Sequence, residues 1–165
     1  MNSKQRLQRQ LASTRRMSER LLADFQSPEQ WVYQVHPNCN HALWFVGHMA
    51  NTDNFLISLV APEKASTFEG WATRFGMGSQ PSGIAADYPP PESVVAEMRE
   101  RRGVLLEVLD GLSEDELAKP TPKGAPDFLP DFASVFELAI WHEGVHSGQL
   151  TVTRRALGHK PLSEG

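Results

Sequence analysis

The sequence contains a single cysteine, Cys39, among its 165 residues. One thiol cannot close an internal disulfide, and it excludes zinc sites that are built from several thiolates. Histidine and carboxylate side chains are therefore the ligands that remain for a metal site in this chain. A chain with so little cysteine is also typical of a reducing compartment, so we expect a cytoplasmic protein.

Long apolar runs and an excess of positive charge are also missing. No run of 18 apolar residues occurs, and the segment MNSKQRLQRQ lacks the apolar stretch of a signal peptide. We therefore expect no membrane partner. The formal net charge is -4, which gives the chain no overall attraction to phosphate backbones, so we also expect no nucleic-acid partner.

Helical periodicity dominates what is present, and convincing alternation of apolar and polar residues is absent. Four long segments carry this periodicity, and most of the proline and glycine lies between them. We expect one domain over residues 1–165 with an all-α fold, an up-down-type four-helix bundle with a long connection between the second and third helices. The expected helices run from about Lys4 to Phe25, from near Asn40 to Pro62, from Pro91 to Leu109, and from Ser134 to Gly158.

The spacing of apolar residues predicts which face of each helix is buried. On the second helix it selects Trp44, His48, Phe55 and Leu59, and on the third Val94, Met98, Leu105 and Leu109. The basic residues between Lys4 and Arg20, Arg15 among them, are interpreted as the solvated face of the first helix. On the fourth helix, which we expect to open with a capping box of Ser134 and Glu137, the predicted buried stripe is Val135, Leu138, His142, Val145, Gln149, Val152 and Ala156.

Histidines interrupt two of these predicted inner faces. A buried imidazole needs partners for its nitrogens, and a metal ion is one such partner. His146 follows His142 by one helical turn, so both rings can reach one ion, and His48 is the best candidate for a third ligand. Gly144 and Gly148 flank the pair and indicate either a closely packed neighbour or room for a ligand.

Each histidine also has an interpretation without a metal. His48 alone is more typical of a core histidine bonded to a carbonyl, and an H-x-x-x-H pair also arises by chance. The combination on two core-facing helices is what favours a divalent metal site. We expect the three other histidines, His36, His41 and His159, to be exposed and without a role in binding.

The segment from His142 to His146 also matches H-E-x-x-H, the zinc-protease signature in which the glutamate acts as general base. Its longer form fails here, because Gln149 and Val152 occupy the positions of the required Gly and His. A metalloprotease is therefore the weaker interpretation. Glu143 is kept as the candidate catalytic residue, although a solvated helix face is the interpretation that we favour for it.

The chain also resembles the DinB-like (damage-inducible) family of metalloenzymes. The resemblance rests on W-F-V-G-H at residues 44–48, on W-H-E-G-V-H-S-G-Q at residues 141–149, and on R-R-A-L-G at residues 154–158. It implies a four-helix bundle in which His48, His142 and His146 bind a divalent ion, often zinc or nickel. Because the wider superfamily includes bacillithiol S-transferases and mycothiol-dependent isomerases, it also implies a low-molecular-weight thiol as a cofactor. Homodimers are frequent in this family.

Three neutral imidazoles leave an ion with open coordination positions, which is typical of catalytic sites. The sequence therefore predicts metal-dependent transfer or hydrolysis on a small electrophilic molecule, with Trp44, Trp71 and Phe75 as candidate pocket walls, and the resemblance implies that the transferase is thiol-dependent. The alternative is a non-catalytic metal-binding or ligand-sensing bundle.

Overall fold

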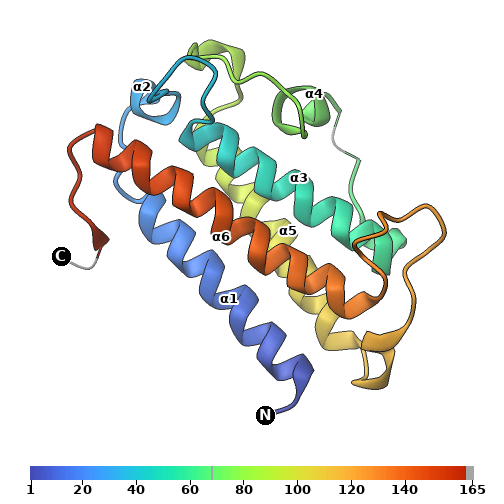
Figure 1. The fold of residues 1–165 in the computed structure, drawn as a ribbon. Coiled ribbons are helices and arrows are strands. Elements are labelled where there is room, and N and C mark those ends of the chain that lie inside the picture. The colour runs from blue at the N-terminus through green and yellow to red at the C-terminus, as the bar shows by residue number, and fades with distance from the viewer. Residues whose placement is uncertain (68, 163–165) are drawn as a thin grey trace.

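The computed structural model describes residues 1–67 and 69–162, and four long helices dominate it (Figure 1). They are α1 (Ser3–Leu22), α3 (Ala42–Val60), α5 (Pro91–Gly111) and α6 (Phe132–Ala156). Shorter helical segments are α2 (Pro28–Trp31), α4 (Trp71–Phe75) and the 3₁₀ turns η1 (Pro62–Lys64), η2 (Ala85–Asp87) and η3 (Asp115–Ala118). The expected all-α four-helix bundle is confirmed. No helix in the described part of the chain is long and apolar enough to cross a membrane.

The helix ends follow the capping rules, but two caps differ from our predictions. α6 begins with a capping box in which Asp131 is the cap and Ser134 its third residue, so the helix starts earlier than the predicted box. α3 is capped by His41 and not by Asn40, since the His41 Nδ1 accepts the backbone N–H of Trp44. Gly158, at a φ of 89°, then ends α6 in the left-handed conformation that favours glycine.

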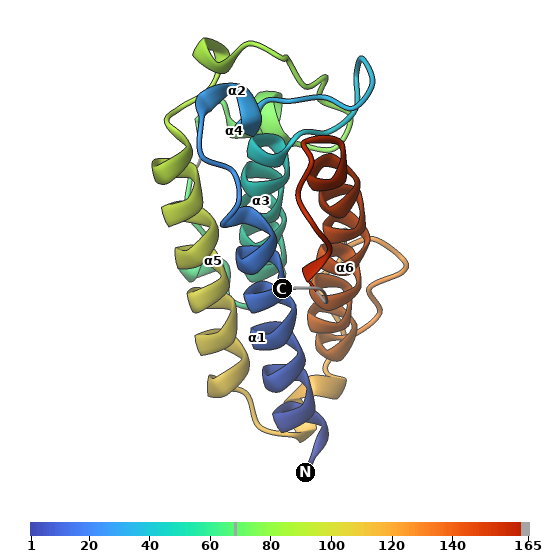
Figure 2. The ribbon, with the colours of Figure 1, turned by 90° about the vertical axis from the view of Figure 1, so that its left-hand side faces the viewer.

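The chain path places parallel pairs side by side. α1 runs parallel to α6, and α3 runs parallel to α5, while α3 and α6 are antiparallel (Figures 1 and 2). Two successive helices can run in the same direction only if the connection returns along the whole bundle. The long connection, predicted over residues 62–91 and observed over residues 61–90, does this, so the bundle departs from strict up-down alternation.

The long connection also covers the site. It carries η1, α4 and η2, and α4 packs against the first half of α3. Gly47 on α3 makes this contact possible, because a Cβ at that position would lie 2.3 Å from the Phe75 ring. Phe75 is fully buried as a result, and its backbone comes close to His48.

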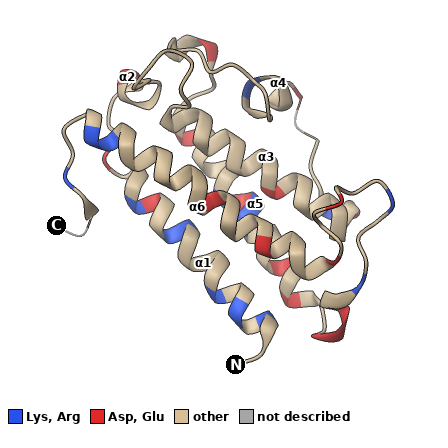
Figure 3. Cartoon of the chain, viewed as in Figure 1, with Lys and Arg blue, Asp and Glu red and all other residues tan. Residues whose placement is uncertain are grey.

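Two apolar clusters form the core, one toward each end of the bundle. The first contains Leu21, Trp44, Phe75, Val94 and Met98, and the second contains Leu11, Leu56, Leu105, Leu109 and Phe136. Between its contributions to the two clusters, each long helix has a buried charged residue that forms ion pairs with those of the other helices. We call this set the charge layer, and it consists of Arg15, Asp53, Arg102 and Glu143. In Figure 3 both signs of charge meet at mid-height between α5 and α6.

The charge layer explains why some predicted faces are wrong. Arg15, expected on the solvated face of α1, is only 6% exposed. The buried line of α6 includes Val135, Phe136, Ala139, Glu143 and Leu150, so the helix is turned relative to the predicted stripe. Val145 and Val152 are consequently exposed, as is Phe55 on α3. The predicted inner stripe of α5 is confirmed, because Val94, Met98, Leu105 and Leu109 are all buried.

Candidate metal centre

The structure brings the three predicted histidines together where α3 crosses α6. One nitrogen of each ring of His48, His142 and His146 can be chosen so that all three lie within 4.8 Å of one another. The Nε2 atoms of His48 and His142 are 3.1 Å apart. Ligand nitrogens at about 2.0 to 2.1 Å from a tetrahedral zinc ion are ~3.3 Å apart, so this donor set fits a divalent ion with little movement.

His48 is held in one orientation by the backbone of α4. Its Nδ1 lies 2.7 Å from the carbonyl oxygen of Phe75. Because a carbonyl only accepts hydrogen bonds, Nδ1 carries the proton, and the lone pair of Nε2 is left facing the other two rings. The close packing of Phe75 on Gly47 therefore also sets the tautomer of a candidate ligand.

A side chain orients His146 in the same way. The His146 Nδ1 lies 3.1 Å from the Oε1 of Gln149, one turn later on α6. The Nδ2 of Asn40, just before α3, donates to the same Oε1 at 3.2 Å. Two donors on one oxygen fix the orientation of the Gln149 amide and assign the proton of His146 to Nδ1.

Burial keeps the cluster uncharged. It lowers the pKa of His48 to about 4, with a smaller contribution from the neighbouring His146. Burial, followed by His146 and His48, lowers the pKa of His142 to about 4, and burial also lowers the pKa of His146. All three rings are therefore neutral at pH 7, which is the protonation state that metal ligation needs. The buried Nδ1 of His142 has no hydrogen-bond partner among the described residues.

Aromatic side chains surround part of the cluster. The Trp44 ring stacks on His48 with centroids 4.3 Å apart, and it lies 5.7 Å from His146. The rings of Trp71 and Phe75 contact each other, with centroids 5.0 Å apart. Phe75 is fully buried, so it is part of the hydrophobic core and not the wall of an open pocket. On α6, a Cβ at Gly144 or Gly148 would meet no described atom within 4 Å. We predicted either a closely packed neighbour or room for a ligand at these glycines. The closely packed neighbour is wrong, because the structure has open space beside both.

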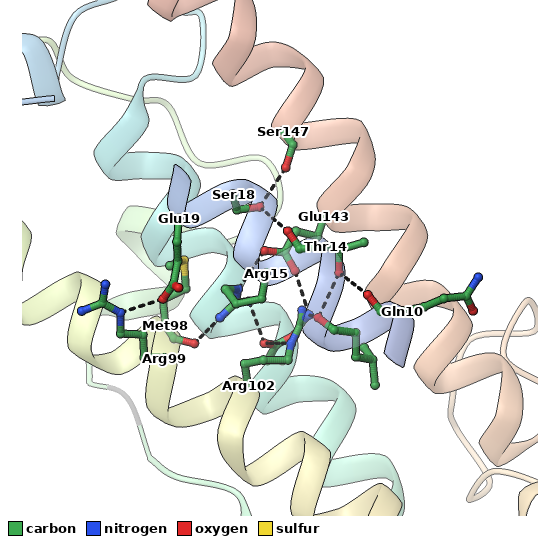
Figure 4. Close-up of polar contacts among 12 residues, drawn as sticks. Gln10, Thr14, Arg15, Ser18, Glu19, Met98, Arg99, Arg102, Glu143 and Ser147 are labelled. Atoms are coloured by element: carbon green, nitrogen blue, oxygen red, sulfur yellow. Dashed lines mark hydrogen bonds and ion pairs between the residues drawn. The ribbon is translucent and has the colours of Figure 1, made fainter. Parts of the chain in front are cut away.

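Glu143 lies between the two α6 histidines in sequence but belongs to the charge layer. Its side chain is fully buried, so the predicted solvated face is wrong. Arg15 Nε donates to its Oε1 at 2.8 Å, and Arg102 Nη1 lies 2.8 Å from its Oε2 (Figure 4). Both carboxylate oxygens thus contact arginines of α1 and α5, whereas the histidines face α3. The use of Glu143 as a base stays a prediction.

The other members of the charge layer complete a balanced set of two cations and two anions. Asp53 accepts from Arg15 Nη2 at 3.1 Å and from two nitrogens of Arg102 at 2.9 and 3.0 Å. Arg102 also donates to the Leu11 carbonyl at 3.1 Å. The two carboxylates keep the pKa of Arg102 raised although burial opposes it.

Sequence reasoning missed the charge layer, yet a signal for it exists. Arg102 follows Met98 by four residues and precedes Leu105 by three, so it occupies a core position of a stripe that we predicted. Asp53 and Arg15 occupy similar positions on their helices. A charged residue at the register of a core stripe, matched by opposite charges on the other helices, indicates a buried ion-pair network.

The remaining histidines differ in their surroundings. His36 is exposed, as predicted, and His159 is partly buried against Phe25. His41 is 1% exposed, which contradicts the predicted exposure. It is buried because its ring caps α3 on one side and lies 3.0 Å from the Ser82 carbonyl on the other.

A comparison with protein families gives a match that agrees with this architecture. The profile of the DinB superfamily matches residues 10–150, which is most of the chain and includes all three histidines. The chain belongs to the DinB superfamily. No curated protein and no solved structure gives a significant match. The predicted DinB-like relationship is therefore confirmed for the family, and the chemistry of this DinB protein has to be argued from its own residues.

Proposed function

We propose that this DinB protein is a metal-dependent enzyme that binds one divalent ion through His48, His142 and His146. The observation that carries the proposal is the convergence of three neutral imidazoles whose nitrogens lie within 4.8 Å of one another. Zinc and nickel are the proposed ions, since imidazole nitrogen is a good ligand for both. The proposed reaction is a thiol-dependent transfer, or a hydrolysis, on a small electrophilic molecule.

The roles of the protein residues follow from their geometry. Phe75 and Gln149 fix the tautomers of His48 and His146, so that each ring presents an unprotonated nitrogen. Trp44 covers one face of His48 and excludes water from it. A divalent ion with three neutral ligands supplies open positions and promotes deprotonation of a coordinated thiol or water.

A cleft beside the histidines can accommodate a small molecule. It has a volume of 360 Å³, and it lies between the loop before α3 and the outer face of α6. Its walls carry apolar groups, amides, one hydroxyl and one thiol but no charged side chain, which suits an uncharged substrate. The residues concerned are Val35, Asn38, Cys39, Asn40, Gln149, Val152 and Thr153.

This cleft adjoins the histidine cluster. Asn40 and Gln149 also line a gap that reaches His146 but is too narrow to hold a water molecule. Neither this cleft nor a larger one of 520 Å³ beside α2 is lined by a histidine of the cluster, but the first is lined by Gln149, whose Oε1 lies 3.1 Å from the Nδ1 of His146. We therefore favour the 360 Å³ cleft as the substrate site, with Gln149 between it and the ion.

The alternative function is a metal-binding or ligand-sensing bundle without catalysis. It is supported by the burial of Glu143, because no other carboxylate belongs to the three-histidine cluster. The protease interpretation is weaker still. In H-E-x-x-H proteases the glutamate acts on water at the metal, whereas both oxygens of Glu143 contact arginines.

Elemental analysis of protein purified without a polyhistidine tag tests the proposal first. We expect about one zinc or nickel ion per chain, and loss of that ion in both His48→Ala and His146→Ala. Stoichiometric metal that survives both substitutions would place the centre elsewhere.

Conjugation of a low-molecular-weight thiol to an electrophile, measured with and without a chelator, then separates the two functions. Activity that disappears with the chelator and returns with added metal supports the enzyme. Bound metal without thiol transfer or hydrolysis of small esters supports the non-catalytic bundle. We also propose a homodimer. The exposed Trp141, Val145 and Val152 on α6 support it, and measuring the mass of the particle in solution tests it.

A further inference from the structure

We propose that Gln149 is a positioning residue for the metal, acting through His146 and itself held by Asn40. This inference rests on the proposed metal centre and adds an outer layer to it. It does not require that the reaction be known.

The hydrogen bonds of the three candidate ligands differ in kind. The Nδ1 of His48 donates to a backbone carbonyl, which no substitution can remove. The Nδ1 of His142 is buried without a hydrogen-bond partner among the described residues. His146 is the one ligand of the three whose Nδ1 donates to a side chain, that of Gln149. The orientation of one ligand therefore depends on a residue that can be exchanged.

The position of Gln149 suits this role. It lies three residues after His146, so the two side chains meet on the same face of α6. An acceptor on Nδ1 holds the ring at one angle, and it makes Nε2 a better electron donor to a metal. The geometry thus gives the Nδ1–H of His146 a fixed acceptor, and this proton is one that can exchange with water.

Asn40 adds a second constraint from a different part of the chain. Its Nδ2 donates to the Gln149 Oε1, while the neighbouring His41 caps α3. The amide of Gln149 is thereby connected to the start of the helix that carries His48. The relay from Asn40 through Gln149 to His146 links the two helices that provide the ligands, and it does so at the edge of the cleft.

The exposure of the relay sets the size of the expected effect. Gln149 is exposed and Asn40 is partly exposed, so water competes for these hydrogen bonds. Removal of a partner of a metal-bound histidine typically weakens metal binding by about 10–100-fold, and we expect about tenfold here.

The test compares cobalt(II) and zinc(II) dissociation constants of three variants with those of the unaltered protein. Gln149→Leu removes the acceptor at nearly constant size, Gln149→Glu keeps an acceptor oxygen, and Asn40→Ala removes only the outer donor. Gln10→Leu, on the exposed face of α1, is the matched control. We expect about tenfold weaker binding for Gln149→Leu, a smaller loss for Asn40→Ala, and native or tighter binding for Gln149→Glu.

A spectroscopic readout separates positioning from a general structural role. In the cobalt(II) form, the exchangeable N–H protons of the ligand rings give separate shifted proton signals. We expect Gln149→Leu to lose one of them by faster exchange, while its metal-free melting temperature stays at the native value.

Each outcome decides between the claims. Binding by Gln149→Leu within twofold of native, or equal weakening in Gln149→Leu and Gln149→Glu, overturns the relay and leaves the metal centre standing. A native protein that binds none of cobalt(II), zinc(II) and nickel(II) overturns the metal centre and the relay with it.

Discussion

The bundle buries two polar clusters next to each other on α6, and they solve the problem of burial in different ways. The charge layer pairs two arginines with two carboxylates, and its net charge is zero. The histidine cluster instead brings together three neutral rings and contains no anion. In the first cluster opposite charges pair with one another, whereas in the second the three rings turn nitrogen atoms toward one another.

This difference shows that adjacent residues of one helix can have separate roles. Successive residues of an α-helix point about 100° apart, so His142 faces α3 while Glu143 faces α1 and α5. The charge layer holds the bundle together without needing a ligand. The histidine cluster has free coordinating capacity, and that capacity is what we assign to function.

The largest effect is expected from opening the charge layer. Asp53→Ala leaves Arg15 and Arg102 buried without their shared carboxylate, and loss of one partner of a buried ion pair costs about 3–5 kcal/mol. Urea unfolding of the metal-free protein measures this loss. The matched control is Asp110→Ala, whose side chain is 78% exposed in its ion pair with Lys4. We expect it to change the free energy of unfolding by less than about 1 kcal/mol. An equal decrease in the free energy of unfolding of both variants would mean that the charge layer contributes no more to stability than an exposed ion pair.

A substitution in the histidine cluster should weaken metal binding strongly and change the free energy of unfolding little. His142→Leu removes a ligand, so metal binding should weaken beyond the ~10–100-fold typical of losing only an outer partner. The metal-free protein should lose no more than about 1.5 kcal/mol in its free energy of unfolding, because the Nδ1 of His142 has no hydrogen-bond partner among the described residues and the substitution removes only the Nε2 contact with His48. Isothermal titration with zinc and urea unfolding measure the two quantities. A strongly destabilised but metal-competent variant would show that His142 is a structural residue.

Glu143→Gln probes the boundary between the clusters. The amide keeps one acceptor oxygen but removes the charge opposite Arg15 and Arg102, so we expect a loss of about 1–3 kcal/mol in stability. Metal content should stay at the native stoichiometry. Loss of metal with unchanged stability would transfer Glu143 to the metal centre. Loss of turnover with native metal content and native stability would favour its role as a base.

The smallest effect concerns pH. The pKa values of folded His48 and His142 lie at about 4, below the ~6.5 of an unfolded chain. Between these values the unfolded state binds more protons, so the free energy of unfolding falls as pH decreases. From pH 7 to pH 6 we expect a loss under about 1 kcal/mol for each of these histidines in the metal-free protein. His142→Leu should have a shallower slope, and an unchanged slope would contradict this origin.

The parts of the fold that the sequence predicts are those governed by local rules. Periodic apolar residues and the prolines between them indicate the four helices, and the length of residues 62–91 indicates the long connection. The clustering of the three histidines could also be predicted from the sequence. Spacing by one turn places His142 and His146 together, and the apolar surroundings of His48 direct it to the same core.

The parts that the sequence did not predict depend on partners from distant segments. Counting apolar residues on α6 favours the face with Val145 and Val152, but the ion pairs of Glu143 turn the other face inward. His41 was likewise misjudged, because its burial depends on the Ser82 carbonyl in the long connection. Neither contact can be inferred from the residues around Glu143 or His41 alone, because the partners lie on other segments.

The charge layer also restricts sliding of the helices along one another. Apolar side chains of similar size can exchange neighbours when one helix shifts by a turn, about 5.4 Å. The paired charges cannot, since such a shift would separate Glu143 from Arg15 and Arg102 in an apolar interior. One row of ions thus sets the vertical register of all four long helices. His142, the next residue along α6, is thereby fixed at the same height as His48.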